Sequence, residues 1–86
     1  MSVPVLTLLS KPGCHLCREM AAEVERLFGD RVLLEEKDIT SDPDLERRFR
    51  LEIPVLLLGQ TEVARHRVSE AELRTRLEAL GIRQGS

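Results

Sequence analysis

The stretch VPVLTLLSKPGCHLC, residues 3–17, decides the fold of this chain. From Val3 to Leu9 the sequence is almost entirely apolar, which is typical of a strand buried on both faces of a sheet. The segment Ser10-Lys11-Pro12-Gly13 breaks this strand. From Cys14 onward the apolar residues recur at helical spacing. We therefore predict a strand that leads directly into a helix, with two cysteines on the first helical turn.

The predicted helix ends at Gly29, because glycine adopts the left-handed conformation that terminates many helices. A second strand is expected over residues 31–39, so the first forty residues predict one βαβ unit. The apolar face of the helix consists of Leu16, Met20, Val24, Leu27 and Phe28.

The middle of the chain predicts a short helix followed by a hairpin. Asp42 and Pro43 suit the N-cap and the first turn of a helix that buries Leu45 and Phe49. The apolar run IPVLLL, residues 53–58, predicts a strand, and the charged segment 61–68 predicts its returning partner at a sheet edge. The link Gly59-Gln60 between them has glycine first, which favours a type II′ turn.

The last helix is predicted from the capping-box spacing of Ser69 and Glu72. We expect this helix to end at Gly81 and residues 83–86 to fray. Its inward-facing residues are expected to be Leu73, Leu77 and Leu80.

The element order β-α-β-α-β-β-α predicts an α/β fold with a four-stranded mixed sheet and three helices on its two faces. The 86 residues have room for one hydrophobic core, so residues 1–86 are expected to form a single domain with an ordered core over about residues 3–80.

Composition and charge exclude several classes of function. Only 2% of the residues are aromatic and the net charge is −2, which argues against nucleic acid as a partner. No apolar run approaches the roughly 20 residues that span a bilayer, and the first residues lack the charged region of a signal peptide. We expect a cytoplasmic monomer with no membrane partner.

The two cysteines of the chain, Cys14 and Cys17, are predicted to do chemistry. A bridge that closes so short a loop removes little entropy from the unfolded chain, so it is a poor structural device. Amide groups and the dipole at a helix start favour a thiolate, and Lys11 and His15 add positive charge nearby. We expect Cys14 to be the nucleophile, with a lowered pKa, and Cys17 to be the resolving thiol.

Two other functions remain open for these cysteines. A zinc or iron–sulfur binding module is one, although zinc takes four ligands and His66 joins Cys14, Cys17 and His15 only if the fold brings it near. A fold kept only for docking to a partner is the other. No resident metal is expected from the sequence. Arg47, Arg48 and Arg50 are expected to form a solvated helix face first and to bind carboxylates of glutathione or a partner second. Residues 65–67 are expected to protect an edge strand from pairing first and to contact a partner second.

The chain resembles the glutaredoxin branch of the thioredoxin superfamily, particularly its short bacterial glutaredoxin-like members. Three features carry the resemblance over about residues 3–80: SKPGCHLC between strand and helix, Ile53-Pro54 at the third strand, and the element order. The resemblance implies a thioredoxin-like fold and thiol–disulfide oxidoreductase activity. It also implies that Pro54 follows a cis peptide bond and faces the cysteines, that the Ile53 backbone pairs with an extended substrate, and that Lys11 meets a glutathione carboxylate.

The sequence departs from the glutaredoxin pattern in two places. His15 and Leu16 stand where glutaredoxins have proline and an aromatic residue, and residues 67–69 replace a Gly-Gly segment that lets glutathione approach the backbone. The expected partners are disulfide-containing proteins or small thiols, with no tightly bound cofactor. Glutathione, bacillithiol and a flavin reductase all remain open as electron donors.

Overall fold

The computed structural model describes residues 3–83 and has the predicted order of elements. Within these residues, no helix has the length and apolar character needed to cross a bilayer. The elements are β1 (Val5–Ser10), α1 (His15–Phe28), β2 (Leu33–Asp38), α2 (Pro43–Phe49), β3 (Val55–Leu58), β4 (Thr61–Arg65) and α3 (Glu70–Ala79), with 3-10 turns η1 (Gly29–Arg31) and η2 (Ile39–Ser41).

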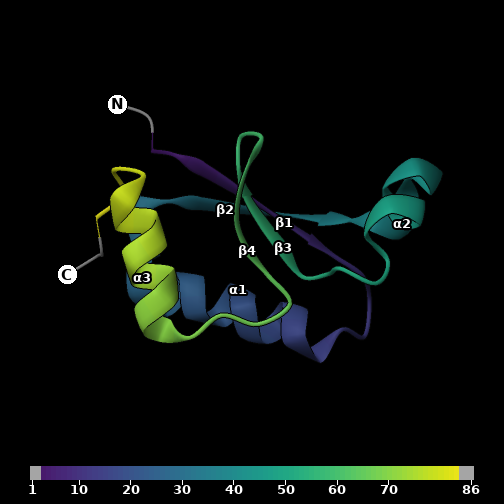
Figure 1. Ribbon diagram of the computed structural model, residues 1–86, viewed down its shortest axis with the longest axis horizontal. Coiled ribbons are helices and arrows are strands. Elements are labelled where there is room, and N and C mark those ends of the chain that lie inside the picture. The colour runs from purple at the N-terminus through teal and green to yellow at the C-terminus, as the bar shows by residue number, and fades with distance from the viewer. Residues whose placement is uncertain (1–2, 84–86) are drawn as a thin grey trace.

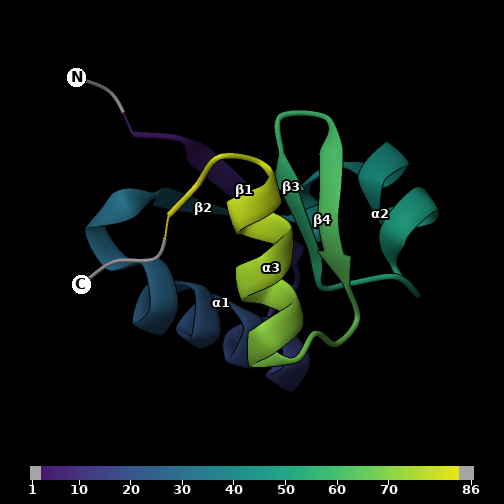
Figure 2. The ribbon, with the colours of Figure 1, turned by 60° about the vertical axis from the view of Figure 1, so that its left-hand side comes forward.

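The four strands form one mixed sheet in the order β2-β1-β3-β4. β1 pairs with β2 in parallel, and the β1–β3 and β3–β4 pairs are antiparallel. Helices α1 and α3 lie side by side on one face, whereas α2 lies at one end of the sheet (Figures 1 and 2). This is the predicted α/β arrangement of a thioredoxin-like fold. It places the C-terminal end of β1 and the N-terminal end of α1 beside the start of β3.

The core is formed by alternate side chains of β1 and by the apolar face of α1. Leu6 and Leu8 point toward the α1–α3 layer, where they join Val24, Phe28 and Leu77, all with 0% exposure. Burial of such side chains stabilises a fold by about 1.5–3 kcal/mol each. The fold is therefore supported mainly from the face that α1 and α3 cover.

The opposite face is covered less completely than the sequence suggests. Helix α2 has only seven residues, and its apolar side chains Leu45 and Phe49 are half-buried rather than buried. The predicted strand begins at Val3, but β1 begins at Val5, and both valines are exposed. Burial of this strand begins at Leu6. Both elements differ from the prediction because a short helix shields one end of the sheet only.

Other predicted features also shift. The third strand starts at Val55 rather than at residue 53. The second strand starts at Leu33 rather than at residue 31, because η1 occupies residues 29–31. β4 stops at Arg65 because His66 adopts a left-handed backbone with φ 63°. Leu80 is 40% exposed instead of inward-facing, and Ile82 fills the core in its place beyond residue 80.

Most of the other predicted helix and turn residues are confirmed, whereas Leu16 is half-buried rather than part of the buried face of α1. Asp42 caps α2 by accepting the Asp44 N–H at 2.9 Å. Gly59 has a positive φ, as the β3–β4 turn requires. Gly29 ends α1 as predicted, but with φ 45° and ψ −120° its backbone lies outside the left-handed helical region. The expectation for the end of the chain concerns residues 83–86, of which 84–86 lie outside the described part.

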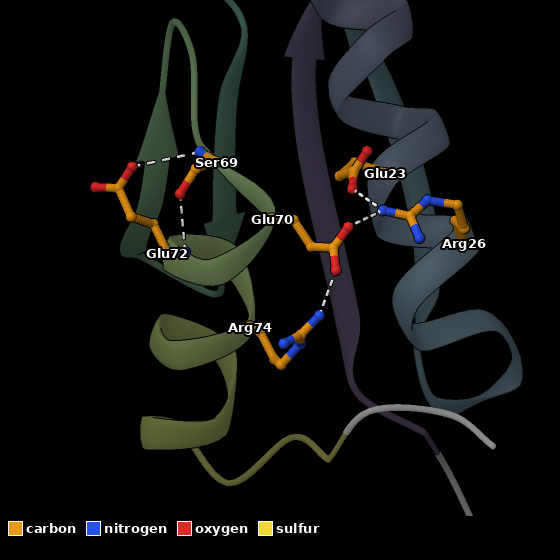
Figure 3. A network of polar contacts seen from close by, with 6 residues as sticks. All are labelled: Glu23, Arg26, Ser69, Glu70, Glu72 and Arg74. Atoms are coloured by element: carbon orange, nitrogen blue, oxygen red, sulfur yellow. Dashed lines mark hydrogen bonds and ion pairs between the residues drawn. The ribbon is translucent and has the colours of Figure 1, made fainter.

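The start of α3 is fixed by a capping box and by an ionic network with α1 (Figure 3). Ser69 Oγ accepts the Glu72 N–H at 3.1 Å, and the Glu72 carboxylate accepts the Ser69 N–H at 3.3 Å, as predicted. Glu70 accepts hydrogen bonds from Arg26 on α1 and from Arg74 on α3. The Arg26 hydrogen bond holds the pKa of Glu70 below its usual value. The hydrogen bond between Arg26 and Glu70 therefore joins α1 to α3 on the face of the sheet that both helices cover.

Candidate active site

The two cysteines occupy the first turn of α1, where the sequence places them. Cys14 is the N-cap residue, and its Sγ accepts the backbone N–H of Cys17 at 3.2 Å. The chain reaches this position through Gly13, whose φ of +80° is costly for other residues, and through a Cys14 N–H bond to the Lys11 carbonyl at 3.3 Å. The structure joins Cys14 and Cys17 as a disulfide, with an S–S distance of 2.28 Å.

The two sulfur-bearing residues differ in their exposure. Cys14 is partly exposed, whereas Cys17 is 4% exposed and packs with Leu9, Ile39 and Ile53. One cysteine is therefore open to a reaction partner, and the other is reached only from within the protein.

The Ile53–Pro54 segment lies against the same apolar cluster as Cys17. Its peptide bond is cis, Ile53 is 8% exposed, and Pro54 is fully buried. The Ile53 N–H donates to the Phe49 carbonyl at 3.1 Å, and the Pro54 carbonyl accepts the His66 N–H at 2.8 Å. The Ile53 N–H is therefore already bonded within the protein.

A hollow of about 340 Å³ opens beside the cysteines. Lys11 lines it, as expected of a residue near the site, whereas His15 is exposed and lies outside this lining. The hollow also contains Arg18, Glu36 and Asp38, which sequence reasoning missed. Arg18 could have been predicted near the site, because it directly follows Cys17 in the sequence. Glu36 and Asp38 could not have been predicted there, because only strand pairing brings the end of β2 beside β1.

Asp38 is anchored in this hollow by a local turn. Its carboxylate accepts the Thr40 hydroxyl at 2.7 Å and the Thr40 N–H at 2.9 Å. These hydrogen bonds, that of the hydroxyl first, hold the pKa of Asp38 below its usual value. The hollow therefore combines anionic and cationic groups next to the sulfurs.

A second hollow of about 400 Å³ lies on the other side of the cysteine turn. It is bounded by Leu16, which stands between the two cysteines, and by the β4–α3 connection, residues 66–69. The segment Arg67-Val68-Ser69 that replaces the Gly-Gly pair is therefore brought next to the turn. The remaining lining residues are Glu19, Met20 and Glu23 of α1 and Glu72 of α3.

The arginines of α2 are occupied locally. Arg47 donates to Asp44, and the Arg48 guanidinium lies 5.1 Å from the centre of the Phe49 ring. Both contacts agree with the expectation of a solvated helix face.

Metal ligands are not gathered around the cysteines. Among residues 3–83, no three or more histidine, cysteine, aspartate or glutamate side chains form a group that would hold a metal ion. His66, the conditional fourth ligand, lies instead with its Nε2 3.5 Å from a Glu52 carboxylate oxygen.

Glu52 is the centre of a charged network that sequence reasoning missed. Its carboxylate accepts a hydrogen bond from Arg65 Nη1 at 2.5 Å, and Arg65 also donates to Glu62 at 2.5 Å. The hydrogen bond from Arg65 holds the pKa of Glu52 below its usual value. The one available signal was the position of Glu52 directly before Ile53.

The comparisons with known proteins agree with this geometry. A solved structure described as "Structure of a malarial protein" has 23% sequence identity and a TM-score of 0.60, and the match covers 91% of this chain and 97% of that one. This likeness shows a shared fold. The family profile of the glutaredoxin-like domain (DUF836) matches residues 5–78, which include the cysteine turn, the Ile53–Pro54 segment and both hollows. The chain belongs to the glutaredoxin-like domain (DUF836) family.

Proposed function

We propose that this protein is a thiol–disulfide oxidoreductase in which Cys14 attacks the substrate and Cys17 resolves the intermediate. The observation that carries the proposal is the hydrogen bond from the Cys17 N–H to Cys14 Sγ at the start of α1. An amide donor and the positive end of the helix dipole both favour a negative sulfur at this place. The exposures of the two cysteines support the assignment of roles, since attack needs access and resolution needs proximity.

The exchange balances in two steps. In the first, the Cys14 thiolate attacks a substrate disulfide, forms a Cys14–substrate disulfide and releases the other substrate sulfur as a thiolate. In the second, the Cys17 sulfur gives its proton to solvent and attacks Cys14 Sγ, which forms the Cys14–Cys17 disulfide and releases the remaining substrate thiolate. The substrate has gained two electrons and the protein has lost two. A thiol donor then reduces the protein disulfide.

The proposed substrates are protein disulfides or small disulfides, reduced in the cytoplasm by a monomer with no tightly bound cofactor. Lys11 supports this choice, since its charge lies beside the reactive sulfurs and suits a substrate carboxylate. The sequence at residues 67–69 lacks the Gly-Gly segment of glutaredoxins, so glutathione, bacillithiol and a flavin reductase are all candidate donors.

Turnover tests the proposal directly. Reduction of insulin or of a mixed disulfide is measured for the wild type and for Cys14→Ser with each candidate donor. We expect catalysis by the wild type and only the uncatalysed rate for Cys14→Ser. Equal rates with every donor would refute the enzymatic proposal. Metal analysis of protein purified without oxygen is run in parallel, because stoichiometric metal that blocks thiol alkylation would instead favour the binding module.

A further inference from the structure

Ile53 packs in the same apolar cluster as Cys17, with Cys14 against it, and we call the Ile53–Pro54 segment the wall of the site. The backbone of this wall is fixed from two sides. On one side, the N–H groups of Glu52 and Ile53 both donate to the Phe49 carbonyl at the end of α2, at 2.8 and 3.1 Å. On the other side, the Pro54 carbonyl accepts the His66 N–H at 2.8 Å. Any residue that fixes His66 relative to Glu52 therefore also fixes this wall.

Glu52 is placed to do this. Its carboxylate lies 2.5 Å from Nη1 of Arg65, the last residue of β4, and 3.5 Å from Nε2 of His66, the residue after it. Arg65 stands opposite Val55 at the last paired position of β3 and β4, so the backbone ladder stops where the Glu52 contacts begin. Glu52 and Arg65 are each 35% exposed, so solvent screens their ion pair in part and the effect of its loss should be modest.

His66 supplies a second, independent observation. It has a φ of 63°, a left-handed backbone that is uncommon for any residue with a side chain and costs energy to hold. Two contacts stabilise it: the N–H bond to the Pro54 carbonyl and the approach of its imidazole to Glu52. This turn directs residues 66–69 toward the hollow beside Leu16. The Ile53–Pro54 segment and residues 66–69 thus depend on the same two contacts of His66.

We propose that Glu52 is a positioning residue of the exchange site, which holds the Ile53–Pro54 wall and the β4–α3 connection at fixed places beside the cysteines for a polypeptide substrate. This inference rests on the proposed function. Glu52 does not contact the sulfurs and takes no part in forming or breaking the disulfide bonds. A polypeptide disulfide must lie along the wall to bring its sulfur to Cys14, whereas a small aromatic disulfide needs only access to Cys14.

The chain offers a matched control in Glu62. Both carboxylates pair with Arg65, but Glu62 lies within β4, and among residues 3–83 its side chain has no hydrogen bond or ion pair with His66 or with the Ile53–Pro54 segment. Glu52→Ala and Glu62→Ala therefore each remove one acidic partner of Arg65, and only the first releases the wall. Glu52→Gln keeps an oxygen that accepts from Arg65.

The experiment compares these three variants with the wild type on insulin and on a small aromatic disulfide. For Glu52→Ala we expect the insulin KM to rise about threefold to tenfold, as expected for one partly exposed charged hydrogen bond, with the small disulfide rate unchanged. Glu52→Gln should recover most of the insulin KM, and Glu62→Ala should behave as the wild type. An unchanged insulin KM for Glu52→Ala, an equal loss on both substrates, or the same KM rise in Glu62→Ala would each overturn the proposal.

Amide hydrogen exchange at His66 separates this proposal from the proposed function. Its N–H is bonded to the Pro54 carbonyl, so its exchange reports on the wall without any turnover. We expect faster exchange in Glu52→Ala than in Glu62→Ala. If the wild type reduces no disulfide, the proposed function fails, and this exchange still shows whether Glu52 holds the wall. Equal exchange rates in the two variants would overturn the positioning role even in an active enzyme.

Discussion

The Cys17→Ser protein is expected to accumulate as a covalent adduct with a polypeptide disulfide substrate. Cys14 keeps its place at the start of α1 and still forms the mixed disulfide, but no second thiol remains to release it, because the chain has only two cysteines. In a single-turnover assay that starts from reduced protein with no thiol donor, the wild type should release fully reduced substrate and Cys17→Ser should release none above the uncatalysed level. Mass spectrometry under non-reducing conditions measures the adduct, which should carry one substrate chain on each protein molecule.

The matched control is Cys14→Ser, which retains the buried Cys17. With Cys17 only 4% exposed, we expect almost no adduct from this variant. Circular dichroism of both variants verifies that each is folded. More adduct from Cys14→Ser than from Cys17→Ser would reverse the assigned roles, and adducts from neither folded variant would contradict the exchange mechanism.

Phe28→Ala is expected to be the most destabilising single change in the α1 layer. Phe28 is fully buried among Leu6, Val24 and Leu77, and truncation of a buried phenylalanine to alanine typically costs about 3–5 kcal/mol. A domain of this size has a total stability on the order of 5–15 kcal/mol, so the variant should be partly unfolded at 37 °C. Urea unfolding followed by circular dichroism measures the loss.

Leu51→Ala is the matched control for this prediction. Leu51 is 76% exposed, so its truncation should change the free energy of unfolding by less than about 0.5 kcal/mol. Urea midpoints for the two variants that differ by less than the experimental error would contradict the described core.

Local patterns in the sequence predicted the elements and the position of the cysteine turn. The change from continuous apolar residues to helical spacing at Cys14, the capping box at Ser69 and the glycine at residue 59 are each encoded within a few neighbouring residues. The structure places each of these features where the pattern predicts it.

The parts that sequence reasoning missed depend on contacts between distant segments. Glu36 and Asp38 come to the cysteines only because β2 pairs in parallel with β1. Glu52 meets Arg65 through the β3–β4 pairing, and no pattern within either segment indicates this ion pair. Ile82 enters the core because the chain turns back at Gly81, a direction that helical spacing does not specify.

The proposed exchange depends on the ionisation of the Cys14 thiol near neutral pH. In reduced Cys17→Ser the one remaining thiol is that of Cys14, so the rate of alkylation by iodoacetamide against pH gives its pKa without interference. The amide of residue 17 remains in this variant. We predict a pKa at least about one unit below the ordinary cysteine value of roughly 8.5. A pKa at or above that ordinary value would contradict a thiolate stabilised by the start of α1.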